Sequence, residues 1–251
     1  MSREKMFPGK MNMTVLRPVQ ENLLPLMEYC REEKFSVFPT AINENPLHNI
    51  PNVTYSKDGK FEHGPYRYAA FTEFENGDEH LVLIRGDISQ TKGLLVRIHA
   101  SFLPGEISGL MASDDREQLN ESLRIIHENG KGILIYLLME GGGNRMASEI
   151  AQLGLTNEGI SLIEAFQQLG VKKENRNFKI AGDILKILFR IFQIEQSCQI
   201  LLLTNNAGKY KVLQDEGFPN VSVKNLAIPS SNKTIEKYLQ SKKDAGLYFD
   251  Q

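Results

Sequence analysis

The sequence predicts a mixed α/β fold, in which a β-sheet is flanked by helices. Residues 66–99 are rich in β-branched and aromatic residues, with apolar side chains at alternate positions. Further along the chain, short continuous apolar runs such as 132–139 alternate with segments of helical periodicity. Buried strands that alternate with amphipathic helices are typical of mixed sheets covered by helices.

The composition limits the classes of function. The chain has 251 residues, of which 41% are hydrophobic and 24% charged, and its formal net charge is -2. A near-neutral balance argues against a nucleic-acid or anionic-membrane partner, because such surfaces need clustered Lys and Arg. No apolar run approaches the roughly 20 residues of a membrane-spanning helix. Cys30 and Cys198 are the only cysteines, which is typical of a reducing compartment, so we expect a cytoplasmic protein.

Met1–Asp58 is expected to be an irregular N-terminal extension. Pro39, Pro46 and Pro51 interrupt this stretch, and proline is not tolerated inside regular structure. The folded domain is expected at residues 59–251, where the composition changes to strand-like alternation.

The elements of that domain follow in chain order. Residues 66–74 and 80–85 should pair as a β-hairpin, because Asn76-Gly77 between them is a strong turn signal. Asp114 and Glu117 resemble a capping box at the start of a helix that ends at Gly130. The other expected elements are strands at 93–99, 132–139 and 199–204, and helices at 143–154, 161–169 and 178–192.

Three polar segments stand between these elements. Glu140 precedes three glycines after a buried strand, where a ligand could approach the backbone; the alternative is a flexible loop. Thr204 and Lys209 follow a second buried strand, where α/β sheets bind ligands; the alternative is a polar turn and a solvated lysine. Glu174 and Arg176 could act together on a phosphate; the alternative is an ordinary loop between helices.

These segments also occur in a recognisable order. The sequences are EHLVLIRGDI, LLVRIH, HENGKGILIYLLMEG, IEAFQQLGV, ENRNF, LLTNNAGK and the tail NKTIEKYLQSKKDAGL. In this order they resemble the GTP cyclohydrolase II family of riboflavin biosynthesis, and only Met1–Asp58 lies outside the resemblance. The resemblance implies the family's mixed sheet with flanking helices, a homodimer, and a nucleotide or related phosphate-bearing ligand.

The resemblance also implies roles for particular residues. Family members bind GTP, expel pyrophosphate and open the imidazole ring with a zinc-bound water, releasing formate. By matching positions, the nucleotide-binding residues are Arg97, Gln118, Glu140, Thr204 and Lys209, and the catalytic residues are Glu174 as base and Arg176 as nucleophile. Arg97, Arg176, Thr204 and Lys209 are expected to converge on one phosphate or sulfate ion.

The zinc ligands of the family are replaced in this chain. Phe102, Ser113 and Asp115 stand where the family has three cysteines, and Gly142 replaces the arginine of its Glu-Gly-Arg-Gly motif. Phenylalanine cannot ligate a metal, and one carboxylate with one hydroxyl does not hold zinc tightly. We therefore expect no zinc, and Mg²⁺ only as the companion of a bound nucleotide.

Three hypotheses for the function follow. In the first, the protein is a diverged enzyme that releases pyrophosphate from a nucleoside triphosphate without opening the ring, with Arg176 or an activated water as attacking group. In the second, it is a non-catalytic nucleotide-binding or interaction homologue. In the third, it is a conventional family member whose zinc is held by other ligands, such as His99 or His127.

Overall fold

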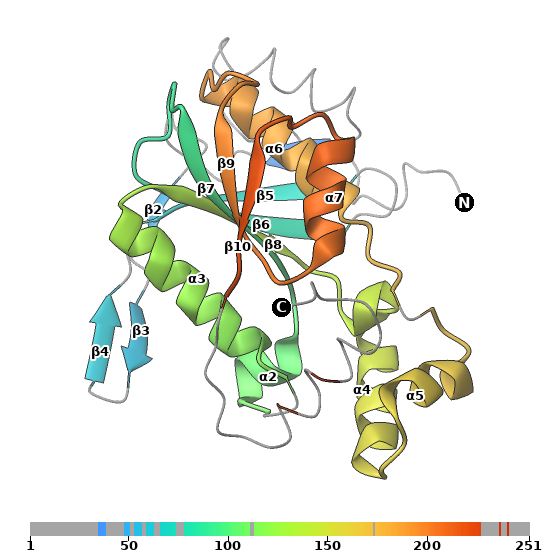
Figure 1. Cartoon of the computed structure of the whole chain (residues 1–251). Coiled ribbons are helices and arrows are strands. Elements are labelled where there is room, and N and C mark those ends of the chain that lie inside the picture. Colours follow the sequence, from blue (N-terminus) through green and yellow to red (C-terminus); the bar gives the residue numbers. More distant parts are fainter. Residues whose placement is uncertain are drawn as a thin grey trace, which may run out of the picture.

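The computed structural model describes residues 35–38, 48–50, 53–56, 59–62, 66–73, 78–110, 113–172, 174–226, 236 and 240. Within these residues the protein is a mixed α/β structure, which confirms the predicted fold class (Figure 1). The strands are β1 (Phe35–Phe38), β2 (His48–Ile50), β3 (Val53–Ser56), β4 (Gly59–Glu62), β5 (Tyr66–Glu73), β6 (Glu79–Arg85), β7 (Gly93–Ala100), β8 (Gly132–Leu137), β9 (Gln199–Leu203) and β10 (Val221–Lys224). The helices are α2 (Leu103–Ser108), α3 (Asp115–Asn129), the 3₁₀ helix η3 (Gly141–Gly143), α4 (Arg145–Asn157), α5 (Leu162–Leu169), α6 (Lys179–Ile191) and α7 (Ala207–Asp215).

One mixed sheet organises the fold. Its strands run in the order β1-β5-β6-β8-β7-β9-β10, with β2 also paired to β5, and β3 and β4 form a separate pair. Strands β8, β7, β9 and β10 run parallel to one another, whereas β6 pairs antiparallel with both β5 and β8. Strands β7, β8 and β9 therefore end at the same edge of the sheet. In α/β sheets this carboxyl edge is where ligands bind.

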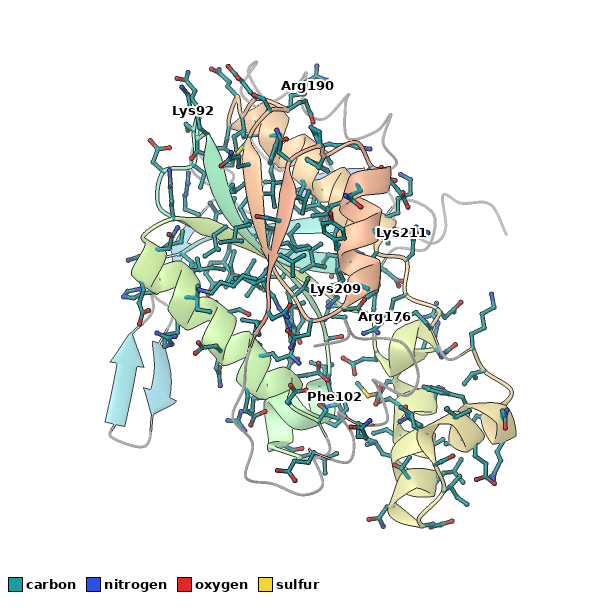
Figure 2. The ribbon with its side chains drawn as sticks, viewed as in Figure 1. Lys92, Phe102, Arg176, Arg190, Lys209 and Lys211 are labelled. Carbon is teal, nitrogen blue, oxygen red and sulfur yellow. The ribbon has the colours of Figure 1, made fainter. Side chains whose placement is uncertain are left out.

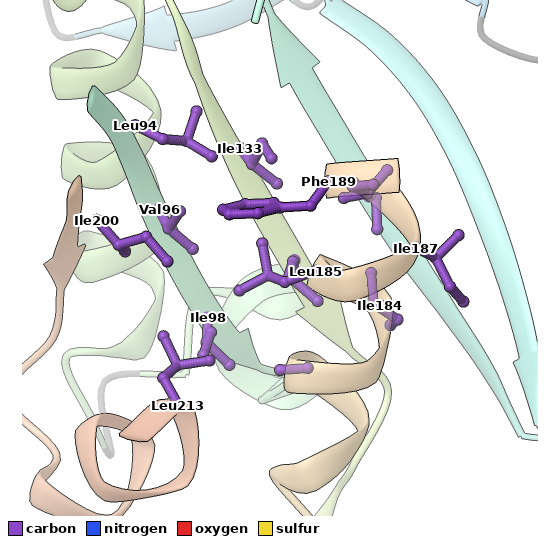
Figure 3. Close-up of a cluster of buried hydrophobic side chains, with 14 of the residues drawn as sticks. Leu94, Val96, Ile98, Ile133, Ile184, Leu185, Ile187, Phe189, Ile200 and Leu213 are labelled. Atoms are coloured by element: carbon purple, nitrogen blue, oxygen red, sulfur yellow. The ribbon is translucent and has the colours of Figure 1, made fainter. Parts of the chain in front are cut away.

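Different helices bury the two faces of the sheet. Leu94 and Val96 of β7 belong to the larger apolar cluster, together with residues of α6 and α7 (Figure 3). Leu95 lies on the opposite face, in a second cluster with Leu123 of α3. Alternate side chains of a strand point to opposite faces, so the apolar run of β7 fills both cores. Phe189 of α6 is 1% exposed, and burying a side chain of this size contributes about 1.5–3 kcal/mol.

The predicted hairpin is confirmed, since β5 and β6 pair antiparallel with Arg67 opposite Ile84. Its turn at residues 74–77 lies outside the described residues. The other predicted strands and helices are confirmed to within a few residues. Ser161 caps α5 by accepting a hydrogen bond from the Glu164 amide. The capping box at Asp114 is wrong, because that side chain makes no cap bond to the backbone.

The irregularity expected of Met1–Asp58 does not hold for residues 35–38, 48–50 and 53–56, the part of this stretch that the structure describes. Strands β1, β2 and β3 lie in this stretch, and both β1 and β2 pair antiparallel with β5. Pro39, Pro46 and Pro51 themselves lie outside the described residues. Strand β3 pairs with β4 across residue 58, and the domain boundary itself stays a prediction.

The elements that were not foreseen from the sequence also include α2, α7 and β10. Pro104 near the start of α2 and Gly109 at its end are the signals that mark this short helix. Asn206 caps α7 by accepting a hydrogen bond from the Gly208 amide. None of the helices in the described residues is long and apolar enough to cross a membrane.

The glycine loop η3 is held against the loop before α6. A Cβ atom on Gly143 would lie 2.6 Å from the carbonyl carbon and oxygen of Asn175 and 2.7 Å from the Arg176 nitrogen. Gly143 also has a φ of 85°, which side chains other than glycine rarely adopt. Only glycine therefore allows the two backbone segments to meet here.

We predict that Gly143→Ala lowers the free energy of unfolding by about 1–3 kcal/mol, because the new methyl group forces the two loops apart. Gly154→Ala is the matched control. Gly154 lies inside α4 with open space around its Cβ position, so alanine there should raise stability by up to about 1 kcal/mol. Urea unfolding of both variants measures the difference, and equal stability of the two would contradict the close approach.

Candidate functional site

The candidate site lies at the carboxyl edge of the parallel strands. Strand β7 leads into α2, β8 leads into the glycine loop, and β9 leads into the turn before α7. The loop that carries Arg176 joins them from the start of α6. Figure 2 shows Arg176 and Lys209 beside each other at this edge, with Phe102 further along it.

Glu174 and Arg176 form a two-point ion pair. The Arg176 Nε donates to Glu174 Oε1 at 2.8 Å, and a second guanidinium nitrogen donates to Oε2. The Arg176 amide also donates to Oε1, at 3.0 Å. Parallel hydrogen bonds of this kind fix the plane of the guanidinium and keep it protonated. The two residues that the sequence predicted as catalytic are thus in direct contact and partly exposed.

Lys209 joins this pair at the ring of Phe178. The Lys209 Nζ lies 5.2 Å from the ring centroid and the Arg176 Cζ lies 5.0 Å from it. The Lys209 side chain is buried and donates to the Ile98 carbonyl of β7 at 3.0 Å. Phe178 therefore brings together two cations from different elements, since the faces of aromatic rings attract positive charge. Phe178 was missed from the sequence, although it closes the ENRNF segment.

The glycine loop docks on the loop that carries Glu174 and Arg176. The Asn175 amide donates to the Gly142 carbonyl at 2.8 Å, and the Asn175 side chain donates to the Gly143 carbonyl at 3.2 Å. The sequence left open whether the three glycines admit a ligand or form a flexible loop. The structure shows that the close approach at Gly143 is to the protein's own backbone, and this contact positions Glu174 and Arg176.

Arg97 is the centre of a buried polar network. It is 2% exposed, and its guanidinium donates to the Leu203 carbonyl at 3.1 Å and to Gln118 Oε1 at 3.0 Å. Gln118 in turn donates to Asp114 Oδ2 at 2.8 Å. These bonds tie β7 to β9 and α3, the elements at the centre of the fold.

The anion site expected of Arg97, Arg176, Thr204 and Lys209 is therefore divided in the structure. Thr204 is fully buried, and its hydroxyl accepts a hydrogen bond from the Asn206 amide at 3.0 Å. Arg176 and Lys209 meet at one ring, although Lys209 also donates to the Ile98 carbonyl. Arg97 and Thr204 use their polar groups in internal contacts. Direct ligand contact by Arg97, Gln118 and Thr204 stays a prediction, which requires these internal bonds to be exchanged.

Two of the three positions at which the resemblance places zinc cysteines are part of the core. Phe102 and Ser113 are buried, and the Ser113 hydroxyl accepts a hydrogen bond from the Asp115 amide at 3.3 Å. Both nitrogens of the His99 ring are engaged, Nδ1 by Arg97 at 3.1 Å and Nε2 by Glu106 at 2.8 Å. Within the described ranges, no cluster of three His, Cys, Asp or Glu side chains could hold a metal ion. These donors do not fit a zinc site.

A hydrogen-bonded pair occupies this part of the site. Because the guanidinium of Arg97 can only donate, His99 Nδ1 accepts, so Nε2 carries the hydrogen that is donated to Glu106. Burial lowers the pKa of His99 to about 4. Burial alone would raise the pKa of Glu106, but hydrogen bonds from His99, Tyr136 and the Phe102 amide lower it. Glu106 was not singled out from the sequence, since a single glutamate in a six-residue helix has no distinctive pattern.

Glu140 lies between the His99–Glu106 pair beside α2 and the glycine loop that contacts Asn175. It is half-buried, and the Leu103 amide donates to its two oxygens at 3.2 and 3.3 Å. Burial raises the pKa of Glu140, and the nearby charges of Glu106 and Asp115 act in the same direction. The carboxylate has about four acceptor positions, so acceptor capacity is left for a ligand.

The fold and this site define an α/β protein with a charged site at the carboxyl edge of its sheet. Comparison with known proteins is more specific. The family model of GTP cyclohydrolase II matches residues 53–223. The chain belongs to the GTP cyclohydrolase II family.

Individual relatives agree with this assignment. Riboflavin biosynthesis protein RibBA of Phocaeicola vulgatus is 34% identical over 183 residues, which are 73% of this chain and 43% of that protein. GTP cyclohydrolase-2 of Picrophilus torridus is 34% identical over 72% of this chain and 90% of its own length. GTP cyclohydrolase-2 of Hamiltonella defensa is 34% identical over 74% and 91%. The chain thus spans less than half of the RibBA protein and most of each GTP cyclohydrolase-2.

We predict that the free energy of unfolding falls as the pH is lowered from about 6.5 to about 4. In this range the unfolded chain protonates His99, whereas the folded protein, in which its pKa is about 4, does not. The slope should approach about 1.4 kcal/mol per pH unit. His99→Gln should remove this part of the slope, and denaturant unfolding at several pH values measures it. An unchanged slope in the variant would show that His99 is not the group responsible.

We also predict that the purified protein holds no stoichiometric zinc, because Phe102, Ser113 and Asp115 replace three thiolates. Elemental analysis of protein expressed in zinc-supplemented medium measures this. One zinc per chain that resists mild chelation would overturn the prediction.

Proposed function

We propose that the protein binds a purine nucleoside triphosphate or a related phosphate compound at the carboxyl edge of its sheet and releases pyrophosphate, leaving the base ring intact. The family membership and the position of the site support the ligand class. The arrangement of Glu174, Arg176 and Lys209 supports the reaction. We place the activity in the cytoplasm and in a homodimer, as the sequence and the resemblance lead us to expect.

The observation that carries the proposal is the meeting of two cations and one carboxylate. Arg176 and Lys209 lie at the same aromatic ring, and Glu174 holds Arg176 by two hydrogen bonds. Phosphoryl transfer depends mainly on positioning and charge neutralisation, with little covalent chemistry required of the protein. A pre-formed pair of cations with an adjacent base has the charges that this reaction needs.

The ion pair indicates which group attacks phosphorus. A guanidinium held by a carboxylate stays protonated and has no free electron pair for attack. We therefore assign the attack to a water molecule, whose oxygen forms a bond to the α-phosphorus while the bond to the oxygen bridging the α- and β-phosphorus atoms breaks. Glu174 takes the proton of the water, and pyrophosphate leaves with the electron pair of the broken bond. Arg176 and Lys209 neutralise the charge on the phosphate oxygens, and Mg²⁺ supplied with the nucleotide would add to this.

A non-catalytic homologue is the second candidate, and the buried Arg97 network favours it. Arg97 and Gln118 are engaged in internal hydrogen bonds. Residues that serve only the fold in this way would leave a binding module without an efficient reaction. Conventional ring opening is the third candidate, although the donors at the zinc position do not fit that metal.

We predict that Arg176→Ala abolishes pyrophosphate release from a nucleoside triphosphate, because the transferring phosphate loses its main positioning cation. Ser113→Ala should leave the rate nearly unchanged, since this buried hydroxyl accepts a hydrogen bond from the neighbouring Asp115 amide and has no role in the proposed reaction. Mass spectrometry of the products should show pyrophosphate and the intact monophosphate, with no formate.

Other results would support one of the other two candidates or would rule out the ion pair as the catalytic group. Formate formed in step with pyrophosphate would support conventional ring opening. Binding of nucleotides without turnover in the wild-type protein would support the non-catalytic homologue. Retention of pyrophosphate release in Arg176→Ala would show that the ion pair is not the catalytic group.

A further inference from the structure

The two cations of the candidate site come from separate elements of the fold. Arg176 lies on the loop before α6, and Lys209 lies in the first turn of α7. Glu174 holds Arg176 from within the same loop, whereas the Lys209 ammonium donates to the Ile98 carbonyl of β7. Each of these contacts fixes one cation to its own surroundings, and neither joins one cation to the other.

The ring of Phe178 is the group that both cations share. The Arg176 Cζ lies 5.0 Å and the Lys209 Nζ 5.2 Å from the ring centroid, and a cation is attracted to an aromatic face within about 6 Å. Phe178 is 5% exposed and belongs to the larger apolar cluster. Its carbonyl accepts a hydrogen bond from the Ala181 amide of α6 at 3.0 Å. The core therefore fixes the ring, and the two cations are arranged around it.

The electrostatics of the ring can be separated from its packing. Two positive charges that lie close together repel each other, most strongly where little water screens them. Lys209 is 6% exposed, so its ammonium has lost most of its hydration. The negative face of an aromatic ring offsets part of this cost, and the attraction is stronger when the cation is desolvated. An aliphatic side chain of similar volume would fill the same space without this effect.

We propose that Phe178 is a positioning residue of the proposed reaction, and that the negative face of its ring holds the Arg176 guanidinium and the Lys209 ammonium together before the phosphates bind. This inference rests on the proposed function, because it concerns the two cations that neutralise the phosphate charge. Phe178 forms no bond to the substrate and acts only through these cations. Groups held in place before the reaction stabilise developing charge without reorganisation, so weakening the ring face lowers kcat more than it changes KM.

The test changes the electrostatics of the ring and keeps its shape. In the full-length protein, Phe178 is replaced by phenylalanines that carry one, two or three ring fluorines, which draw electron density from the ring face and add little volume. Pyrophosphate release from GTP is measured for each protein. We expect kcat to fall with each added fluorine, to about one tenth of the wild-type value with three, while the Tm stays within about 2 °C.

Two comparisons separate this effect from a general disturbance of the core. The same fluorinated residues at Phe189 should leave kcat unchanged, because Phe189 lies near the other end of α6 and packs edge-to-face on the Phe218 ring at 5.2 Å. Lys209→Met removes one of the two cations and keeps Arg176. In that background the decrease of log kcat per fluorine at Phe178 should be about half as large.

The outcomes distinguish this inference from the proposed function. If the wild-type protein releases pyrophosphate and kcat does not depend on the number of fluorines at Phe178, the inference is wrong and the proposed function stands. An equal decrease in the Phe189 series, or an undiminished one in Lys209→Met, would overturn the inference in the same way. Absence of pyrophosphate release by the wild-type protein would overturn the proposed function itself, and with it this inference.

Discussion

The candidate site depends on the contact between Gly143 and the backbone of Asn175 and Arg176. No side chain fits between these segments, because a Cβ atom on Gly143 would come within 2.6 Å of Asn175. The contact joins the loop after β8 to the loop before α6, which are more than thirty residues apart. It fixes the position of Arg176 relative to the end of the parallel strands. The placement of the Glu174–Arg176 pair relative to the glycine loop follows from this backbone approach.

The polar groups at the carboxyl edge form two sets with different physical character. Arg97, Gln118 and His99 are buried, and their hydrogen bonds close on one another and on backbone carbonyls. Arg176 and Glu174 are partly exposed, and their charges remain accessible to a ligand. A buried network of this kind is rigid because each lost hydrogen bond leaves an unsatisfied group. The exposed pair can change partners at little cost, so it is the part of the site suited to chemistry.

The residues at the positions where the resemblance places zinc ligands take part in the packing around α2. Phe102 is buried with a ring that packs against Gly105 of α2, and Glu106 of the same helix bonds His99 and Tyr136. The helix α2 thus supplies apolar packing and a carboxylate in the region where the resemblance places a metal. The His99–Glu106 hydrogen bond ties β7 to α2. The stability that this pair contributes depends on pH, because burial of the imidazole lowers the pKa of His99.

The sequence by itself determined the fold class and most of the elements, because strand alternation, the Asn76-Gly77 turn and the cap at Ser161 are local signals. It also determined that Glu174 and Arg176 are close, since they are two residues apart. It did not determine that β1 and β2 extend the sheet, because strand pairing is non-local. Nor could it show that Phe178 gathers Arg176 and Lys209, or that Glu106 bonds His99. These arrangements depend on which loops the parallel strands bring to one edge, and only the tertiary structure decides that.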